Sequence, residues 1–546
     1  GGVGRRGWRG GAEGGGGVGM IEGVTGSARS AAVALGRAFV AGGAELPTAV
    51  ERTAERMVDA GAWLAAVSDA REGFGAGLLP APGRIIDCVE AALLLPEDEG
   101  HAFERTAFEE LLGTPESAGF RHAFLAERRA ARPADLAGVN PRAFYRAGVV
   151  GGGALGAALA NGLLAAGQSV TLLERDSAAL SAGLARVART HDRAVERGRM
   201  TPEAREEEWA RIGGATEAAA LATADIVIEA LPDQAARAEF VSGFDDLAKR
   251  GAVFATASQP TEVAHIAQAS GRAADVIGLA PGGPIAGAKL LEVVIGADTA
   301  PEVTLAVLAL ARKMGRVPVR AEGDVIGPRI ITAWRTAMDF LLEEGASPYE
   351  IDRVLRQWGF AVGPYELHDL TGLDTAEERS RRLMLRRDPA RRYVAVVERL
   401  CAAGRFGRRA GKGYYLYADA GARGKEDREV LSLIAMEREA KGILPRKINT
   451  EEIADRSLAA MANEGVRLIE DGVVRHPSDI DVAMIAGYGF PRWRGGPMQA
   501  TDAEGLLAIR NALLDYAREE DLFWRPGAVW DELIKNGMSF DDLNRA

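Results

Sequence analysis

The spacing of hydrophobic positions changes along the chain, and each change marks a different kind of structure. Residues 1–75 begin with a glycine–arginine stretch that cannot form a core and continue with weak, alanine-rich helical patterns. Residues 76–140 carry apolar positions at helix spacing and predict a helical linker. Over residues 141–325 short apolar runs alternate with helical segments, and after residue 326 the pattern is helical to the end.

The alternating region predicts an α/β domain with a doubly wound sheet of the Rossmann type. Its strand-like runs lie at 142–150, 169–173, 225–231, 252–256 and 276–279. Helical segments separate these runs, and such βαβ alternation is typical of a parallel sheet with helices on both faces.

The helical region contains an internal repeat. The positions that the copies share are Ile351-Asp352, Gly363-Pro364, Asp369 and Gly372 in the first, and Ile480-Asp481, Gly496-Pro497, Asp502 and Gly505 in the second. From the Gly-Pro pair onward the two copies have the same spacing. We therefore expect two tandem all-α domains of common origin, over residues 326–425 and 445–546.

The composition argues against several classes of partner and indicates a cellular location. The chain has 77 acidic and 66 basic residues, a net charge of −11, which argues against nucleic acid as the main partner. Its 2 cysteines, Cys88 and Cys401, exclude a disulfide framework or a cysteine-rich metal site and favour a cytoplasmic location. No apolar run reaches the roughly 18–20 residues that a membrane helix needs, and no signal peptide is evident. The first residue is glycine rather than methionine, as expected of a fragment or a misplaced start.

A glycine fingerprint, GxGxxG, follows the first predicted strand at Gly151, Gly153 and Gly156. The first glycine permits a tight turn, the second lets the backbone approach a pyrophosphate, and the third allows close helix–strand packing. The helix that begins at Ala154 and Leu155 offers free N–H groups to phosphates. The pattern predicts a dinucleotide-binding site.

Glu174 selects the dinucleotide. It stands at the end of the second predicted strand, eighteen residues after Gly156. A carboxylate there can accept hydrogen bonds from the adenosine ribose and would repel a 2′-phosphate, so the sequence favours NAD over NADP. The neighbouring Arg175 is the one feature that would suit NADP.

Six longer stretches point to one family. They are ADIVIEA at 224–230, KLLEVV at 289–294, EEGASPYEID at 343–352, GPYELHDLTGLD at 363–374, GRFGRRAGKGYYLY at 404–417 and IDVAMIAGYGFPRWRGGPM at 480–498. With them the chain, from about residue 79 on, resembles the 3-hydroxyacyl-CoA dehydrogenases, specifically the dehydrogenase half of bacterial multifunctional enzymes of fatty-acid β-oxidation. The resemblance implies NAD-dependent oxidation of a 3-hydroxyacyl-CoA, with Glu229 and Arg237 also at the cofactor.

The hydratase half of those multifunctional enzymes has no counterpart here. Only about 80 residues precede the part that carries the resemblance, too few for such a domain. We therefore expect no enoyl-CoA hydration by this chain. A separate enoyl-CoA hydratase or thiolase is an expected partner, and oligomerisation is left open.

The resemblance also implies a catalytic histidine followed twelve residues later by a glutamate. The glutamate is present as Glu292, but the histidine position is Ala280, because the family's His-Phe-Phe-Asn-Pro reads Ala-Pro-Gly-Gly-Pro here. The family's Asn-Thr-Ser turn reads Ala-Ser-Gln and ends at Ser258 and Gln259, and an asparagine is replaced by Pro328. Alanine cannot take a proton, and loss of a general base costs about 10²–10⁴ in rate. Slow turnover is therefore expected.

Several side chains have two interpretations. Glu292 is either catalytic or an exposed acid at a strand end. His368 and Tyr365 lie on one helical face and either replace the lost base or pack structurally, the second being favoured. The basic cluster of Arg405, Arg408, Arg409 and Lys412 either meets CoA phosphates or solvates a loop, and the loop is favoured.

Three functional hypotheses remain. The first is a working 3-hydroxyacyl-CoA dehydrogenase with modified or relocated catalytic groups. The second is a non-catalytic relative that binds NAD or acyl-CoA as a sensor or partner subunit. The third is an oxidoreductase for another hydroxyacyl substrate.

Overall fold

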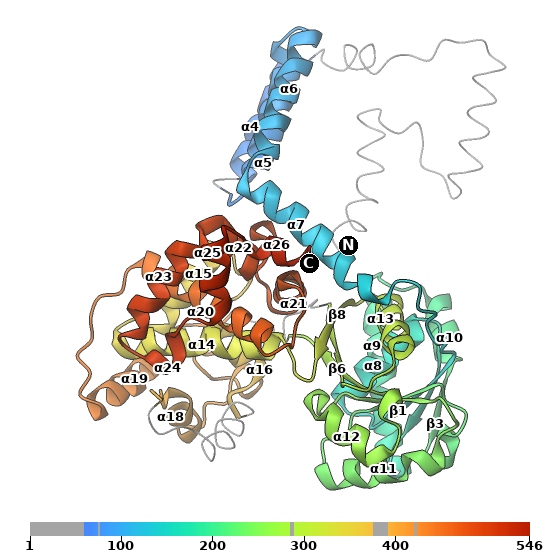
Figure 1. Ribbon diagram of the computed structural model, residues 1–546. Coiled ribbons are helices and arrows are strands. Elements are labelled where there is room, and N and C mark those ends of the chain that lie inside the picture. Colours follow the sequence, from blue (N-terminus) through green and yellow to red (C-terminus); the bar gives the residue numbers. More distant parts are fainter. Residues whose placement is uncertain (1–58, 75–76, 284–288, 375–390, 420–422, 546) are drawn as a thin grey trace, which may run out of the picture. The chain divides into compact units, whose positions relative to one another are not determined.

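The computed structural model describes residues 59–74, 77–283, 289–374, 391–419 and 423–545. They belong to two compact units, which divide between Thr114 and Pro115. The first unit comprises helices α4 (Ala60–Phe74), α5 (Pro80–Leu94) and α6 (Glu97–Leu112) among its described residues (Figure 1). The division falls inside the predicted linker, because the next helix, α7 (Pro115–Ala130), belongs to the second unit.

The second unit contains an eight-stranded sheet in the order β3-β2-β1-β4-β5-β6-β7-β8. The strands are β1 (Arg146–Val150), β2 (Ser169–Leu173), β3 (Ile212–Ala215), β4 (Ile226–Glu229), β5 (Val253–Thr256), β6 (Val276–Pro281), β7 (Leu290–Ile295) and β8 (Val317–Glu322). Strands β1 to β6 run parallel, β7 is antiparallel to β6, and β8 is parallel to β7. The order reverses between β1 and β4, where open α/β sheets bind their ligands. The doubly wound sheet is confirmed.

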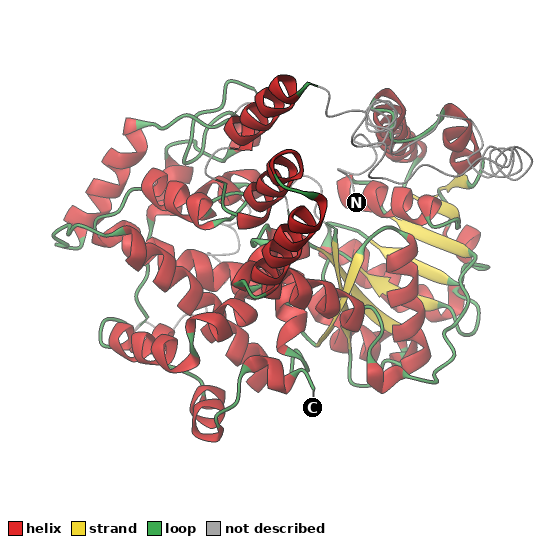
Figure 2. Ribbon diagram, turned by 90° about the horizontal axis from the view of Figure 1, so that it is seen from above, coloured by secondary structure: helices red, strands yellow, loops and turns green. Residues whose placement is uncertain are grey.

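Helices cover both faces of this sheet (Figure 2). They are α8 (Ala154–Ala165), α9 (Ser177–Glu196), α10 (Pro202–Trp209), α11 (Gln234–Leu247), α12 (Val263–Ser270) and α13 (Pro301–Lys313). Successive residues of β1 serve opposite faces: Val149 shares a core with Leu163 of α8, and Val150 shares one with Phe244 of α11. Strands buried on both faces read as continuous apolar runs, which is why the sequence revealed them.

The helical region begins with α14 (Gly327–Glu344), α15 (Pro348–Trp358), α16 (Pro364–Thr371), α18 (Val396–Ala402) and α19 (Arg428–Ala440). It continues with α20 (Thr450–Glu470), α21 (Pro477–Tyr488), α22 (Pro497–Glu504), α23 (Leu506–Ala517), α24 (Asp521–Trp524), α25 (Ala528–Asn536) and α26 (Phe540–Leu543). Its core is continuous with one face of the sheet. None of the helices described in either unit is both long and apolar enough to cross a membrane.

Buried aspartates give the two copies of the repeat the same internal connections. Asp352 accepts two backbone N–H groups at the start of α16, and Asp481 accepts one at the start of α22. Asp369 and Asp502 each accept two successive backbone N–H groups from further along their own copies. Asp352 and Asp481 thus satisfy orphan donors at a helix start in both copies. The second pair differs, because Asp502 receives its N–H groups from the start of α26 and Asp369 receives them from Tyr414 and Tyr415, which lie outside any helix.

Candidate functional site

The glycine fingerprint lies in the turn between β1 and α8, as the sequence predicts. Gly151 has a φ of 96°, in the left-handed region that favours glycine. A Cβ atom on Gly156 would lie 1.8 Å from the Gly151 carbonyl oxygen, so α8 packs directly on the turn. A Cβ on Gly153 would meet no atom within 4 Å, which leaves the N terminus of α8 open to a ligand. This backbone fits a diphosphate.

A cavity of about 760 Å³ opens beside this turn. Its lining includes Gly151, Gly153, Leu231 and Phe240. Glu174, directly after β2, also lines it, and its Oε1 accepts the Gly152 N–H at 2.7 Å. The Arg175 side chain borders the cavity too but is 86% exposed. The carboxylate therefore stands in the wall of the cavity, where a ribose contact was expected.

A second hollow, of about 610 Å³, lies between α8 and α9 and was missed at the sequence level. Arg186, Arg189 and Arg193 line it from one face of α9, together with Arg316, and its described lining contains no Asp or Glu. Arg186 also borders the first cavity and donates to the Gly152 carbonyl at 3.0 Å. The spacing i, i+3, i+7 was the available signal, since it places three guanidinium groups on one helix face. Such a groove suits a ligand with several phosphates.

The structure places Glu229 and Arg237 behind the first cavity rather than in its lining. Glu229 ends β4, is fully buried, and accepts hydrogen bonds from Thr256 Oγ1 (3.0 Å) and Ser258 Oγ (2.8 Å). Arg237 also reaches Ser258 Oγ, at 3.4 Å, and pairs with Glu262 at 3.2 Å. This network joins the loop after β5 to the end of β4 and to α11.

Ala280 and Glu292 are directly opposite each other in the antiparallel pair β6–β7. The twelve-residue spacing is therefore a cross-strand pair, whose Cβ atoms in general lie about 4.5–5.5 Å apart. The strands β1, β4, β5 and β6 are neighbours in the sheet and all run parallel. The carboxyl end of β6 therefore lies at the same edge of the sheet as the glycine turn. The strand register expected from the sequence is present, without the imidazole.

Glu292 is fully buried, so the interpretation as an exposed strand-end acid is wrong. Its carboxylate accepts the backbone N–H groups of Ile326 at 2.5 Å and Gly327 at 3.1 Å, at the start of α14. Burial raises the pKa of this carboxyl to about 7, although both hydrogen bonds favour the ionised form. Glu292 therefore has a structural task, capping α14, that does not require a neighbouring base.

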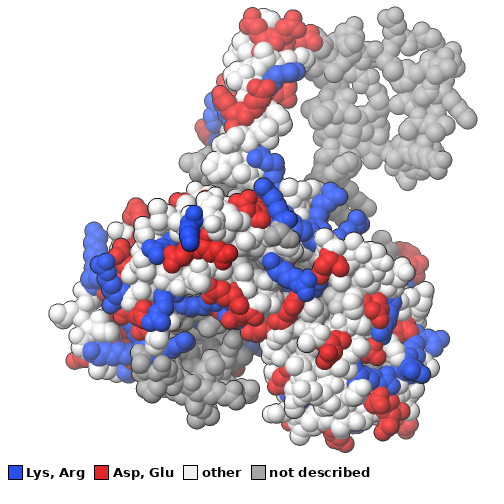
Figure 3. Space-filling view, viewed as in Figure 1, with Lys and Arg blue, Asp and Glu red and all other residues white. Residues whose placement is uncertain are grey.

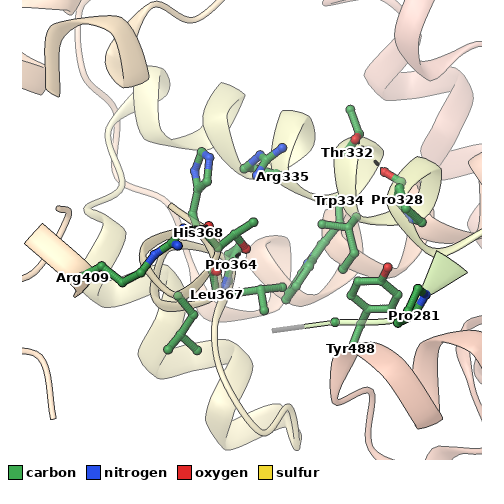
Figure 4. A pocket seen from close by; sticks show the side chains of 14 residues that line it. Pro281, Pro328, Thr332, Trp334, Arg335, Pro364, Leu367, His368, Arg409 and Tyr488 are labelled. Carbon is green, nitrogen blue, oxygen red and sulfur yellow. Dashed lines mark hydrogen bonds between the residues drawn. The ribbon is translucent and has the colours of Figure 1, made fainter. Parts of the chain in front are cut away.

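A cavity of about 580 Å³ lies beyond the end of β6 (Figure 4). Pro281 and Gly283 line it from the sheet, Pro328 and Thr332 from α14, and Tyr488 from the end of α21. Pro328 sits in the first turn of α14, where a missing N–H costs nothing. Its ring presents no hydrogen-bonding group to the cavity where the family resemblance implied an asparagine.

His368 and Tyr365 have different surroundings. Tyr365 is fully buried, does not line the cavity, and donates to Asp339 Oδ1 at 3.2 Å. His368 lines the cavity, and its two ring nitrogens have no hydrogen-bond partner among the described residues. Burial holds the pKa of His368 well below its usual range. Figure 4 places His368 at the opposite end of the cavity from Pro281, so it does not occupy the position of the missing base.

Of the remaining polar positions, Arg409 lines the cavity beyond β6, whereas Gln259 and Arg405 do not. Gln259 precedes the short helix η3 (Pro260–Glu262) and does not line this cavity. In the basic cluster, Arg405 is fully buried and pairs with Asp427 and Glu429 at 2.8 Å, so the solvated-loop interpretation is wrong for that residue. Arg409 is exposed, lines the cavity, and donates to the Thr371 carbonyl at 3.2 Å.

Comparison with known families agrees with this geometry. The family model for the 3-hydroxyacyl-CoA dehydrogenase NAD binding domain matches residues 146–325. The model for the C-terminal domain of the same family matches residues 326–417 and 453–539. The second model thus falls on both copies of the internal repeat.

Curated relatives and solved structures give the same result. The chain is 31% identical to the fatty acid oxidation complex subunit alpha of Shewanella amazonensis, over 85% of this chain and 66% of that protein. It is also 31% identical to the peroxisomal bifunctional enzyme of Danio rerio, over 79% of this chain and 62% of that protein. The chain thus spans somewhat less than two thirds of the length of these relatives.

Two solved structures share the fold. One is the Escherichia coli 3-hydroxybutyryl-CoA dehydrogenase, with a TM-score of 0.61 and 23% identity over 72% of this chain and 100% of that chain. The other is the dehydrogenase part of multifunctional enzyme 1 from C. elegans, with a TM-score of 0.56 and 23% identity over 75% of this chain and 96% of that chain. The family models carry the assignment, because together they match residues 146–417 and 453–539, more than half of the chain: the chain belongs to the 3-hydroxyacyl-CoA dehydrogenase family.

Proposed function

We propose that this chain binds NAD and an acyl-CoA as an NAD-dependent 3-hydroxyacyl-CoA dehydrogenase whose turnover is slow because the base is missing. The observation that carries this proposal is the pairing of Ala280 with Glu292 at the sheet edge that also holds the glycine turn. The cavity beside the glycine turn and the cavity beyond β6 are each lined by residues at the carboxyl ends of parallel strands, the usual position for a ligand in such sheets.

Each part of the site has a task in this proposal. NAD, when bound, accepts a hydride from the 3-carbon of the substrate. The N terminus of α8 holds its diphosphate, and Glu174 accepts hydrogen bonds from the adenosine ribose. The arginine groove, defined by Arg186, Arg189, Arg193 and Arg316, binds the phosphates of CoA. No side chain at position 280 accepts the hydroxyl proton, so water must do so at a cost in rate.

A second candidate function is non-catalytic binding of NAD or acyl-CoA by a sensor or partner subunit. The environment of Glu292 favours this alternative, since its carboxylate is held by α14 in the absence of an imidazole. An oxidoreductase for another hydroxyacyl substrate is the third. A measurement of turnover distinguishes the first two alternatives, because a sensor would bind NAD and acyl-CoA without converting them.

The names of the relatives suggest which proteins this chain works with. Because relatives are subunits of a fatty acid oxidation complex, we propose a separate enoyl-CoA hydratase or thiolase as partner and leave self-association open. The few cysteines favour a cytoplasmic location. Figure 3 shows Lys and Arg interspersed with Asp and Glu over the described residues in view, a surface unlike the continuous basic field that nucleic acid binding requires.

Binding and turnover measured on one preparation test the proposal. We expect NADH and acetoacetyl-CoA to bind in calorimetry and the reduction to run at least about a hundredfold below ordinary enzyme rates of about 1–10³ per second. Crotonyl-CoA should not be hydrated. Absence of NADH binding would refute the proposal. Reduction at ordinary rates would instead place a base elsewhere, with His368→Ala as the next variant to assay.

A further inference from the structure

The middle of the glycine turn is held from two sides by side chains that lie outside it. The Gly152 N–H donates to Glu174 Oε1 at 2.7 Å, and the Gly152 carbonyl accepts from Arg186 Nη1 at 3.0 Å. Helix α9 can approach the turn because Gly183 faces it: a Cβ atom on Gly152 would lie 2.9 Å from the Gly183 Cα. Arg186 follows Gly183 by three residues and therefore lies on the same face of α9. The turn and this helix thus move as one contact.

Arg186 lines two separate cavities. One is the cavity beside the glycine turn, where it stands with Gly153 and Glu174, and the other is the arginine groove, where it stands with Arg189. Among the described residues that line these two cavities, Arg186 alone belongs to both. A guanidinium carries several N–H donors in a planar fork, so one arginine can contact two anionic ligands at once.

The charges around Arg186 differ between the two sides. The described lining of the cavity beside the turn contains Glu174, Asp233 and Glu239 and two arginines, Arg175 and Arg186. The side chain of Arg175 is 86% exposed. The described lining of the arginine groove is basic and contains no Asp or Glu. Arg186 is thus the cation at the boundary, placed to meet anionic groups from both cavities.

We infer that Arg186 couples the two ligands, so that NADH in the cavity beside the turn tightens the binding of CoA phosphates in the arginine groove. The inference rests on the proposed function, which assigns a ligand to each cavity. Arg186 is an exposed residue, and the first ligand to bind restricts its side chain, so the second ligand meets a guanidinium already in place. The same positive charge lies between two anions and offsets their repulsion. Because coupling is reciprocal, CoA phosphates would tighten NADH binding by the same factor.

Calorimetry with adenosine 3′,5′-bisphosphate tests the coupling without turnover. This probe carries phosphates of CoA but lacks the thioester arm, so it does not depend on the cavity beyond β6. We expect it to bind the full chain about fivefold more tightly when NADH is saturating than in its absence. In Arg186→Met this ratio should fall to about one or below. Arg186→Lys retains the charge and should keep a ratio above that of Arg186→Met.

Arg189→Met is the matched control. Arg189 lies on the same face of α9 and lines the groove but not the cavity beside the turn. Its loss should weaken binding of the bisphosphate by the same factor with and without NADH, so that the ratio stays at about five.

The other outcomes separate the inference from the proposed function. If Arg186 merely holds the Gly152 carbonyl, Arg186→Met loses NADH affinity and keeps the ratio, which overturns the coupling. A wild-type ratio of one, or weaker binding in the presence of NADH, overturns it too and leaves both ligand sites standing or in competition. Failure of NADH to bind refutes the proposed function itself, and failure of the bisphosphate to bind in either state refutes its assignment of the groove. A ratio lost in Arg186→Met and kept in Arg189→Met supports the inference.

Discussion

The cavity beside the glycine turn, called the crevice below, and the β6–β7 strand pair lie at one edge of the same sheet. They differ in which features of a dehydrogenase site are present. In the crevice the decisive features are properties of the backbone: a positive φ at Gly151, close packing at Gly156 and open space at Gly153. In the strand pair the backbone register is also in place, but the side chain that would do the chemistry is absent at Ala280. The backbone register of a site can therefore be in place where the side chain at one of its positions is not the one that the resemblance implies.

Glu292 has a structural role even though the residue opposite it, Ala280, carries no imidazole. Its carboxylate joins β7 to the start of α14 and thus connects the sheet to the helical region. Removal of an imidazole from the facing strand leaves that connection intact. The capping of α14 by Glu292 therefore does not depend on which side chain stands at position 280.

The strongest change in ligand binding should come from a substitution in the cavity beside the glycine turn. Gly156→Val places side-chain atoms where even a Cβ lies 1.8 Å from a backbone oxygen, so the turn must shift. We expect NADH affinity in calorimetry to fall by about a hundredfold or more. Gly153→Ala is the control for folding, because its Cβ meets no atom within 4 Å. Normal NADH binding by Gly156→Val would show that the crevice is not the cofactor site.

The burial of Glu292 in the β6–β7 pair should make the free energy of unfolding depend on pH. The pKa of Glu292 is raised from 4.5 to about 7 in the folded protein, so the folded state keeps a proton that the unfolded state releases. Its contribution is therefore most favourable below pH 4.5 and is lost as the pH rises through 7. The loss is about 3 kcal/mol at about 1.4 kcal/mol per pKa unit.

Glu292→Gln removes this titration. Urea unfolding at pH 5 and pH 7.5 should show the variant gaining on the wild type by about 2 kcal/mol at the higher pH, since part of the titration lies outside this interval. Glu207→Gln, at an exposed position on α10, is the control. A free-energy difference that stays constant with pH would mean that the carboxyl is not buried as described.

A smaller effect concerns the choice between dinucleotides. Glu174→Ser removes the carboxylate that would repel a 2′-phosphate, so we expect the preference for NADH over NADPH to shrink by about tenfold. NADH should also lose some affinity, since the Glu174 side chain holds the Gly152 N–H. Titration of both cofactors against both proteins measures this. Equal affinity of the wild type for NADPH would place Glu174 away from the ribose.

The sequence predicted five strands, β1, β2, β4, β5 and β6, and missed three, the buried β7 and the edge strands β3 and β8. β3 has two glycines in four residues, and β8 contains Pro318, which is tolerated because β8 is the last strand of the sheet. Neither composition resembles a strand. Predictions that rest on local backbone, such as the turn at Gly151, need only neighbouring residues.

The candidate site was less predictable, because its contacts join distant segments. The capping of α14 by Glu292 links groups 34 and 35 residues apart, and no local pattern announces it. The pairing of Ala280 with Glu292 was accessible through a spacing that the family resemblance supplied. The two ends of the cavity beyond β6 were not, since Pro281 and His368 come together only in the folded chain.

We infer that the β6–β7 pair holds positions 280 and 292 in the register that the family reaction needs and lacks only the base. Ala280→His tests it most directly. An imidazole at this position would face Glu292, whose oxygens have further lone pairs to orient and stabilise it. We predict a modest gain, up to about tenfold, in the rate of acetoacetyl-CoA reduction, and loss of that gain in Ala280→His with Glu292→Gln. If a folded, NADH-binding Ala280→His variant shows no gain, the β6–β7 pair is not a catalytic frame that lacks only its base.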